Sequence, residues 1–217
     1  MVRKSYNQKC GLAWALDVLG GRWTILILRE LLVGPRRFTD LEAGLPGIGS
    51  NLLTDRLKHL QHHGVARRTT LSGPVPVQVY ELTEAGRAVE PALVPLVRWG
   101  WNYAAPEDID RQASQVPWHI FGLRARFDAV RAQGVNETYE FRVDDVVFHA
   151  RVSDGALVTR LGPATAPDIV VTTDEDTFLR TADSEDELTK AIETGAFQVS
   201  GSMRTYRRAR RIFSRTE

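Results

Sequence analysis

Residues Leu45–Arg68 read LPGIGSNLLTDRLKHLQHHGVARR, and this stretch decides how the first half of the chain folds. A turn rich in Gly and Pro comes first, and a helix is predicted to follow it over Asn51–His63. Ser50 stands where a helix cap is expected, and Gly64 stands where the helix ends. The residues after Gly64 are basic and begin a predicted strand.

The predicted helix has two different faces. Leucines at helical spacing form its apolar face: Leu53, Leu57 and Leu60. Side chains that can bond base edges and phosphates form the opposite face: Asn51, Thr54, Asp55 and Lys58. A helix with a buried back and a hydrogen-bonding front suits the major groove of DNA. An ordinary amphipathic helix with a solvated face has the same pattern, so this segment alone leaves both interpretations open.

The surrounding segments predict a winged arrangement. Helices are expected before this stretch, over Leu12–Leu19, Arg22–Val33 and Phe38–Ala43. After it, two runs with the period of strands, Val65–Leu71 and Val77–Leu82, lead to a long helix capped by Thr83. This order predicts a mainly α domain with a β-hairpin wing, the winged helix-turn-helix fold, over residues 1–104.

The rest of the chain predicts a second domain. Residues 105–117 (APEDIDRQASQVP) are polar and lack a hydrophobic period, so they are interpreted as a linker. Residues 118–217 begin with a helix, continue with four short strands, and end with two helices, a strand and a basic helix. This order predicts an α+β layer. The arginines of the last helix are expected to meet the acidic segment 183–187 or solvent; a membrane or DNA is the alternative.

Composition sets further limits. Hydrophobic residues make up 43% of the chain and charged residues 25%, which fits a globular protein. No apolar run is long enough to span a bilayer and no secretion signal is evident, so we expect a cytoplasmic protein with no membrane partner. Residues 1–104 carry 13 Lys and Arg against 8 Asp and Glu, whereas residues 105–217 carry 15 against 19. Only the first half is therefore expected to meet a polyanion.

Several short motifs in the first half resemble the HxlR family of bacterial winged-helix transcription regulators. The motifs are Cys10, DVLGGRW at Asp17–Trp23, ILRELL at Ile27–Leu32, GPRRF at Gly34–Phe38, LPGI at Leu45–Ile48, LTDRL at Leu53–Leu57 and YELTEAG at Tyr80–Gly86. The resemblance covers roughly Cys10–Trp101 and implies a homodimer that binds double-stranded DNA with one wing per subunit. The wing loop SGPVP departs from the expectation of a basic wing tip, because it carries no Arg or Lys.

The second half, mainly Asp168–Phe213, resembles a sterol-carrier-protein domain of type two. The matching pieces are DIVVTTDEDTFL and AFQVSGSMRTYRRARRIF. The resemblance implies an apolar cavity that takes lipid-like ligands. The residues expected to line it are Phe141, Phe148, Ile169 and Phe178. A packed core is the alternative interpretation of these side chains.

Two sets of side chains are candidates for DNA binding and dimerisation. The candidate DNA contacts are Arg36, Arg37, Ser50, Asn51, Thr54, Lys58, Arg67 and Arg68. The candidate dimer contacts are Leu12, Leu16, Leu93, Val97, Trp99 and Trp101. Solvation is the alternative for the first set, and packing within one subunit is the alternative for the second. Arg56 is an alternative partner for an internal ion pair, and Pro91 and Pro95 should kink the last helix of this domain or delay its start.

Other chemistry finds little support in the sequence. Cys10 is the only cysteine, so no internal disulfide is expected; beside Lys9 and a helix start it is a candidate redox sensor, with simple burial as the alternative. The histidines lack metal-ligand spacing, and no nucleophile motif, Walker loop or dinucleotide fingerprint occurs. We therefore expect no metal, no cofactor and no enzymatic activity.

These observations together predict a sequence-specific, DNA-binding transcription regulator, controlled by an apolar ligand in the second domain or by chemistry at Cys10. The alternative is a lipid-binding carrier whose winged domain serves as an interaction platform.

Overall fold

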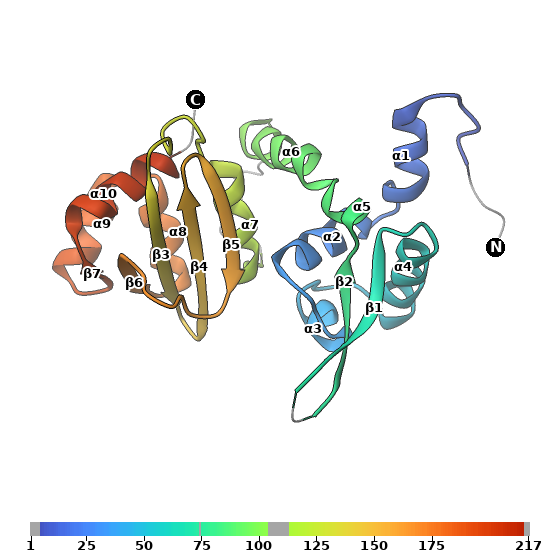
Figure 1. Ribbon diagram of the computed structural model, residues 1–217, viewed down its shortest axis with the longest axis horizontal. Coiled ribbons are helices and arrows are strands. Elements are labelled where there is room, and N and C mark those ends of the chain that lie inside the picture. The colour runs from blue at the N-terminus through green and yellow to red at the C-terminus, as the bar shows by residue number, and fades with distance from the viewer. Residues whose placement is uncertain (1–4, 74, 104–112, 215–217) are drawn as a thin grey trace. The chain divides into compact units, whose positions relative to one another are not determined.

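The computed structural model describes residues 5–73, 75–103 and 113–214. The chain divides into two compact units, Met1–Leu96 and Val97–Glu217, and each is described by itself (Figure 1). The boundary falls inside helix α6 (Glu90–Tyr103). Most of the predicted linker at 105–117 lies outside the described residues, so the linker and the domain limits remain predictions.

The first unit has the predicted order of elements. They are α1 (Gly11–Leu19), α2 (Thr24–Val33), α3 (Phe38–Ala43), α4 (Ser50–His62), β1 (Ala66–Leu71), β2 (Val77–Leu82), α5 (Glu84–Arg87) and the start of α6. Strands β1 and β2 pair antiparallel, and this hairpin is the wing (Figure 1). The winged helix-turn-helix fold predicted for this part of the chain is confirmed.

The segment after the wing differs from the single long helix that was predicted. Thr83 caps a helix as expected, since its hydroxyl accepts the N–H of Gly86 at 3.2 Å, but this helix, α5, ends at Arg87. Helix α6 then begins at Glu90 with Pro91 in its first turn, where the missing N–H has no helical partner to lose. Pro91 therefore marks a delayed start, as one of the two expectations had it.

The core of the first unit lies between α2, α3, α4 and the wing. Helix α2 is buried along most of its length, which explains why its sequence is apolar on nearly every side. The leucines of α3 and α4 in this core are at most 1% exposed: Leu41, Leu53, Leu57 and Leu60. This packing fixes one face of α4 and leaves the other face open.

The second unit contains a mixed five-stranded sheet and helices. After the last turns of α6 come α7 (Val116–Arg126), β3 (Asn136–Val143), β4 (Val146–Ser153), β5 (Ala156–Leu161), β6 (Ile169–Thr173), α8 (Glu175–Ala182), α9 (Glu185–Glu193), β7 (Phe197–Gly201) and α10 (Met203–Ile212). The strand order is β5-β4-β3-β6-β7, in which β3 and β6 run parallel and the other pairs antiparallel (Figure 1). The α+β expectation is correct at this level, while the sterol-carrier resemblance remains a prediction.

Helix α7 is shorter than its predicted extent of Trp118–Gln133. It ends at Arg126 because Phe127 takes an extended backbone conformation. Asp128 then starts a turn in which its carboxylate accepts the N–H groups of Val130 and Arg131. These hydrogen bonds hold the pKa of Asp128 below its ordinary value.

Among the described residues, no single helix has the length and apolar character of a membrane span. Helices α1 and α2 reach that length and composition only as a pair, and the pair is bent by 80°.

Candidate nucleic-acid interface and cavity

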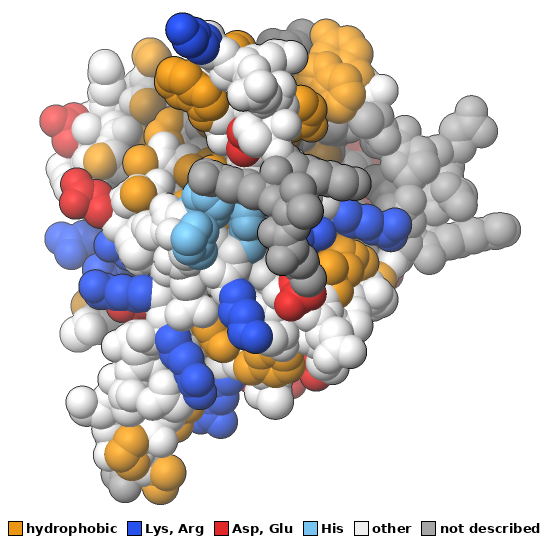
Figure 2. Space-filling model, turned by 90° about the vertical axis from the view of Figure 1, so that its right-hand side faces the viewer, with side chains coloured by type: hydrophobic (Ala, Val, Ile, Leu, Met, Phe, Trp, Pro, Cys, Tyr) orange, Lys and Arg blue, Asp and Glu red, His pale blue; other side chains and the backbone are white. Residues whose placement is uncertain are grey.

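Helix α4 presents the polar face predicted for it. Asn51 and Lys58 are exposed and Thr54 is half-buried, whereas the leucines on the back of the helix are buried. Figure 2 shows this region of the surface, with the histidine side chains in the middle and Lys and Arg side chains spread around them. The face therefore combines hydrogen-bonding groups with positive charge, as DNA recognition requires.

The start of α4 corrects one prediction. Ser50 is not the cap; it is the first helical residue, and Gly49 occupies the cap position with an extended backbone. The Ser50 hydroxyl instead donates a hydrogen bond to the carboxylate of Glu42 in α3. Ser50 is exposed, so it remains a candidate DNA contact, but its hydroxyl is already engaged.

Two side chains on the flank of α4 hold the helix in place. Arg56 donates from Nε to the carbonyl oxygen of Arg22 at 3.1 Å, and His59 Nε2 lies 3.0 Å from the carbonyl oxygen of Val18. Arg56 is thus internally bound as expected, but its partner in this contact is a backbone carbonyl and not a carboxylate. These bonds tie α4 to the turn between α1 and α2.

The two arginines before α3 are not equivalent. Arg36 pairs through its backbone with Tyr80 of β2, at 2.9 and 2.7 Å. Its Nε and Nη2 are buried and have no hydrogen-bond partner among the described residues, so only part of its guanidinium could reach a phosphate. Arg37 is exposed, and its backbone N–H donates to Asp40 in the first turn of α3. Arg37 is therefore the stronger phosphate candidate of the two.

The two arginines at the base of the wing also differ. Arg67 lies opposite Glu81 in the hairpin and forms an ion pair with it, with Nε and Oε1 2.7 Å apart. Arg68 is exposed, lies opposite Tyr80, and has no ion pair among the described residues. Because Glu81 offsets the charge of Arg67, Arg68 is the stronger phosphate candidate of the pair.

The candidate dimer residues fall into two groups. Leu12 and Leu16, on one face of α1, are 69% and 40% exposed, and Trp99 in α6 is 55% exposed. Leu93 is only 5% exposed within its own chain, so it has little area left for a partner. Val97 is half-buried, and Trp101 is half-buried with the guanidinium of Arg126 5.3 Å from its ring centre. The structure thus argues against Leu93 and Trp101 as dimer contacts.

Cys10 immediately precedes α1. Its side chain is exposed and its thiol is free, so the alternative that it is simply buried is wrong. Its backbone carbonyl accepts the N–H of Trp14 at 3.0 Å. A role in redox sensing stays a prediction.

The second unit contains a cavity of about 890 Å³ between its helices and one face of its sheet. Phe141, Ile169 and Phe178 line this cavity, as expected from the sequence. Phe148 does not: it is fully buried behind Phe141, and the two rings stack with centres 4.9 Å apart. The volume lies in the range of small-molecule binding sites.

The polar part of this cavity was not predicted from the sequence. Ser114 and His119 line it, and both contact Glu175: the Ser114 hydroxyl at 2.8 Å and His119 Nε2 at 2.7 Å. Burial lowers the pKa of His119 although the contact with Glu175 opposes this, so the imidazole is neutral at neutral pH. The signal in the sequence is weak, because the residues in contact are 56 and 61 positions apart.

Ser114, His119 and Glu175 are the residue types of a hydrolytic triad, and they contact one another. In a triad the serine and the acid bind different nitrogens of the imidazole. Here Ser114 and Glu175 both contact Nε2 of His119. This geometry does not position the imidazole to take a proton from the serine and gives no support for catalysis.

The first unit as a whole defines a class of protein. Its helix-turn-helix with an open polar face on the second helix and a flanking wing is that of a DNA-binding transcriptional regulator. A family model described as HxlR-like helix-turn-helix matches residues 18–108. The chain is also 37% identical over 97 residues to the HTH-type transcriptional regulator YvaP of Bacillus subtilis, covering 44% of this chain and 89% of that protein. The chain therefore belongs to the HxlR-like helix-turn-helix family.

Other proteins and one further family model also resemble parts of the chain. The HTH-type transcriptional regulator sll1512 of Synechocystis is 35% identical over 101 residues, covering 46% of this chain and 75% of that protein. The solved structure of the reduced form of the transcriptional regulator YodB from B. subtilis is 30% identical, with a TM-score of 0.41, covering 46% of this chain and all of that one. A second family model, described as alkyl sulfatase C-terminal, matches residues 122–216.

Proposed function

We propose that two copies of this chain pair and read a palindromic operator, each with its α4 in a major groove. The observation that carries this proposal is the division of α4 into a buried leucine face and an open polar face. Two helices one DNA turn apart, about 34–36 Å, would read two half-sites. As a DNA-binding regulator the protein acts in the cytoplasm. Selection of bound duplexes from a random pool tests sequence preference directly.

The exposed apolar face of α1 supports pairing. Leu12 and Leu16 lie one helical turn apart on the same face and are both exposed. Elsewhere in this segment, Tyr6 and Trp14 are also more than half exposed. Clustered large apolar side chains on a surface are typical of protein interfaces. Trp99 and Tyr103 of α6, whose rings are 6.1 Å apart, provide a second exposed apolar group. We place both groups in the dimer interface.

Replacing Asn51 or Lys58 by Ala is expected to raise the dissociation constant for the selected operator by about tenfold or more, since a good base contact contributes ~1–3 kcal/mol. Both side chains are exposed, so the melting temperature should not change. Fluorescence anisotropy titration measures the affinity, and Gln133→Ala, at an exposed site in the second unit, serves as control. Unchanged affinity in both α4 variants would remove this face from the interface.

The wing is tested by salt dependence. If Arg68 contacts a phosphate in each subunit, Arg68→Ala should make the slope of log affinity against log salt shallower by about 1.8, at roughly 0.9 for each phosphate. Arg67→Ala is the matched comparison, and its effect should be smaller because Glu81 already offsets the charge of Arg67. Equal slopes for wild type and Arg68→Ala would show that the wing base makes no such contact.

Control of DNA binding is assigned to the second unit. An apolar, lipid-like molecule in its cavity would shift the protein between two states only if it binds them with different affinity. Phe141, Ile169 and Phe178 supply the apolar wall. Oxidation of exposed Cys10 is a second route, tested by measuring DNA binding before and after peroxide treatment.

The cavity also supports a second candidate function. A carrier of lipid-like molecules would need an internal apolar space, and about 890 Å³ is sufficient for one small amphiphile. In that case the winged unit would serve as an interaction platform. Strong binding of apolar ligands without preference for any duplex would favour the carrier over the regulator.

A further inference from the structure

The cavity of the second unit has an aromatic wall and a polar end. Seven of its lining residues are aromatic: Trp101, Trp118, Phe141, Phe178, Phe197, Tyr206 and Phe213. The charged and polar side chains that line it come from α7, α8, α10 and the segment before α7. The aromatic wall suits an apolar body, so the chemistry of the ligand's other end depends on the state of those polar side chains.

Each arginine in the lining already has a carboxylate partner. Arg126 binds Asp183 through two parallel bonds of 2.5 and 2.7 Å, and it is only 14% exposed. Arg210 lies 3.2 Å from Glu185. A bidentate pair of this kind is strong and satisfies the guanidinium geometrically. An anionic ligand would have to compete with one of these carboxylates for the positive charge.

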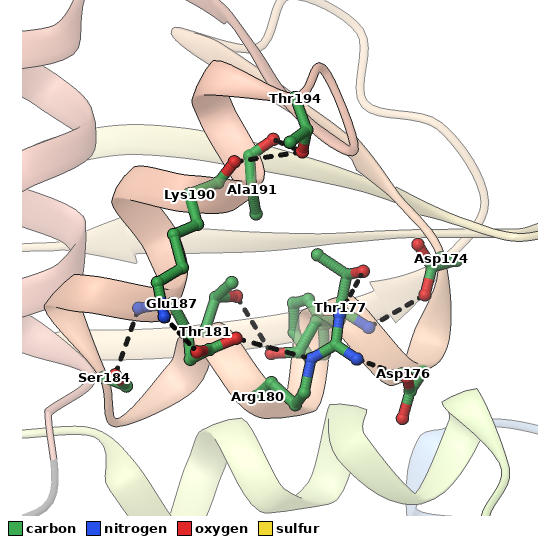
Figure 3. Close-up of polar contacts among 11 residues, drawn as sticks. Asp174, Asp176, Thr177, Arg180, Thr181, Ser184, Glu187, Lys190, Ala191 and Thr194 are labelled. Carbon is green, nitrogen blue, oxygen red and sulfur yellow. Dashed lines mark hydrogen bonds and ion pairs between the residues drawn. The ribbon is translucent and has the colours of Figure 1, made fainter.

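The third arginine is bound in the same way. Figure 3 shows Arg180 of α8 directed toward Asp176, with Nη1 and Oδ2 2.8 Å apart. Its Nη2 contacts the hydroxyl of Thr177 at 3.2 Å, and its Nε lies 3.8 Å from Glu187 of α9. Arg180 thereby joins the two helices, and its charge is offset on both sides.

The other polar groups at the cavity wall, a serine hydroxyl and a neutral imidazole, carry no charge. Ser114 and neutral His119 line the cavity, and Glu175 accepts hydrogen bonds from both. An anion at this end would face the carboxylate of Glu175. A cation would share the cavity with the guanidinium groups of Arg126, Arg180 and Arg210. The charge of Arg126 is felt at His119 even beside Asp183, because it helps to lower the pKa of that imidazole. A hydroxyl both donates and accepts, so it can join this network without an unpaired charge.

We propose that the cavity binds an uncharged amphiphile with a hydroxyl-type head at Ser114 and His119, and that it discriminates against amphiphiles with anionic or cationic heads. This inference rests on the proposed ligand role of the second unit and adds to it the class of ligand and the residues that select it. The discrimination follows from the ion pairs of the wall, above all Arg126 with Asp183.

Isothermal titration of the full chain with decanol, decyl sulfate and decyltrimethylammonium tests the proposal, because the three probes share one chain and differ in head charge. Decanol is expected to bind at least tenfold more tightly than either ion. Gly122→Phe, which points a ring from α7 into the cavity beside Trp101, should abolish decanol binding. Tighter binding of either ion would overturn the assignment of the head group and leave the cavity as a ligand site.

Asp183→Asn provides a test that does not depend on loss of binding. It frees Arg126 from its carboxylate, so affinity for decyl sulfate should rise at least tenfold while affinity for decanol changes less than threefold. Glu193→Gln removes the same charge from an exposed position at the end of α9 and should change neither. An unchanged preference in Asp183→Asn would overturn the role of the ion pair. If no probe binds, the ligand role falls too, whereas DNA recognition by α4 is judged separately from the Asn51 and Lys58 variants.

Discussion

Replacing Leu12 and Leu16 together by Asp is expected to leave the protein monomeric and to weaken operator binding by about a thousandfold or more. Both leucines are exposed on α1, so the substitution removes apolar area from the proposed interface without creating a cavity in the core. Two carboxylates on each subunit would then face two more across the dimer axis, and their desolvation and repulsion oppose pairing.

The size of the expected effect follows from symmetry. Specific dimeric regulators bind DNA with dissociation constants of roughly 10⁻⁸–10⁻¹¹ M, or about 11–15 kcal/mol. A monomer contacts one half-site and retains roughly half of that free energy. Its affinity then falls into the non-specific range of about 10⁻⁴–10⁻⁶ M. Loss of the dimer is therefore expected to cost more than loss of any one base contact.

Light scattering after gel filtration measures the mass, and anisotropy titration measures the affinity. The matched control is Val130→Asp, because Val130 is also an exposed apolar residue but lies in the second unit. It adds one carboxylate per subunit at an exposed apolar site and should leave both the mass and the affinity unchanged. A Leu12 and Leu16 variant that stays dimeric would place the interface elsewhere, and the exposed rings of Trp99 and Tyr103 would be the next site to test.

The sequence predicts the faces of α4 well because leucine spacing alone determines them. It predicts the cap incorrectly because capping depends on the backbone conformation of one residue. Gly49 is extended and Ser50 is already helical, so the serine hydroxyl turns to Glu42, eight residues earlier. Serine is common both at the cap and at the first helical position. The hydrogen bond that distinguishes the two positions here joins α4 to α3, so the local sequence does not show it.

The candidate phosphate contacts show that the charge of a residue does not by itself predict which partner the residue binds. Arg67 and Arg68 are adjacent and identical in type, yet the hairpin register places Glu81 opposite only the first. That register follows from the length of the wing loop, so the pair could have been predicted by counting back from the turn. The burial of Arg36 beside Tyr80 has no comparable local signal, because it depends on how α3 meets the wing.

The lining of the cavity also depends on tertiary packing that the local sequence does not show. The apolar pattern of the strands, together with the resemblance, names Phe141 and Phe148 as residues of a cavity or of a packed core, and both are buried. It does not say which ring borders a space and which lies behind another ring, because that depends on the helices that cover the sheet. The polar end of the cavity, with His119 on α7 and Glu175 on α8, joins segments that the sequence keeps apart.

Gly86→Ala is expected to destabilise the winged unit by about 3 kcal/mol, at the upper end of what overpacking costs. Gly86 closes the motif YELTEAG, and a Cβ at this position would lie 2.1 Å from the carbonyl oxygen of Val65. Neither side can yield easily, because that carbonyl also accepts the N–H of Thr83 at 3.1 Å, and the Thr83 hydroxyl caps α5. The glycine in the motif thus serves close contact between α5 and the start of the wing.

Calorimetry of the full chain should show the transition of the winged unit lowered by roughly 12–24 °C, at about 4–8 °C for each kcal/mol in a domain of this size. Gly100→Ala is the control of opposite sign. Gly100 lies in the part of α6 that belongs to the second unit, and an added Cβ there would meet no heavy atom of the described chain within 4 Å. Helix propensity should therefore stabilise the second unit by ~0.5–1 kcal/mol and leave the transition of the winged unit unchanged. A small effect of Gly86→Ala would mean that α5 can move away from β1. The motif glycine would then require an explanation outside packing.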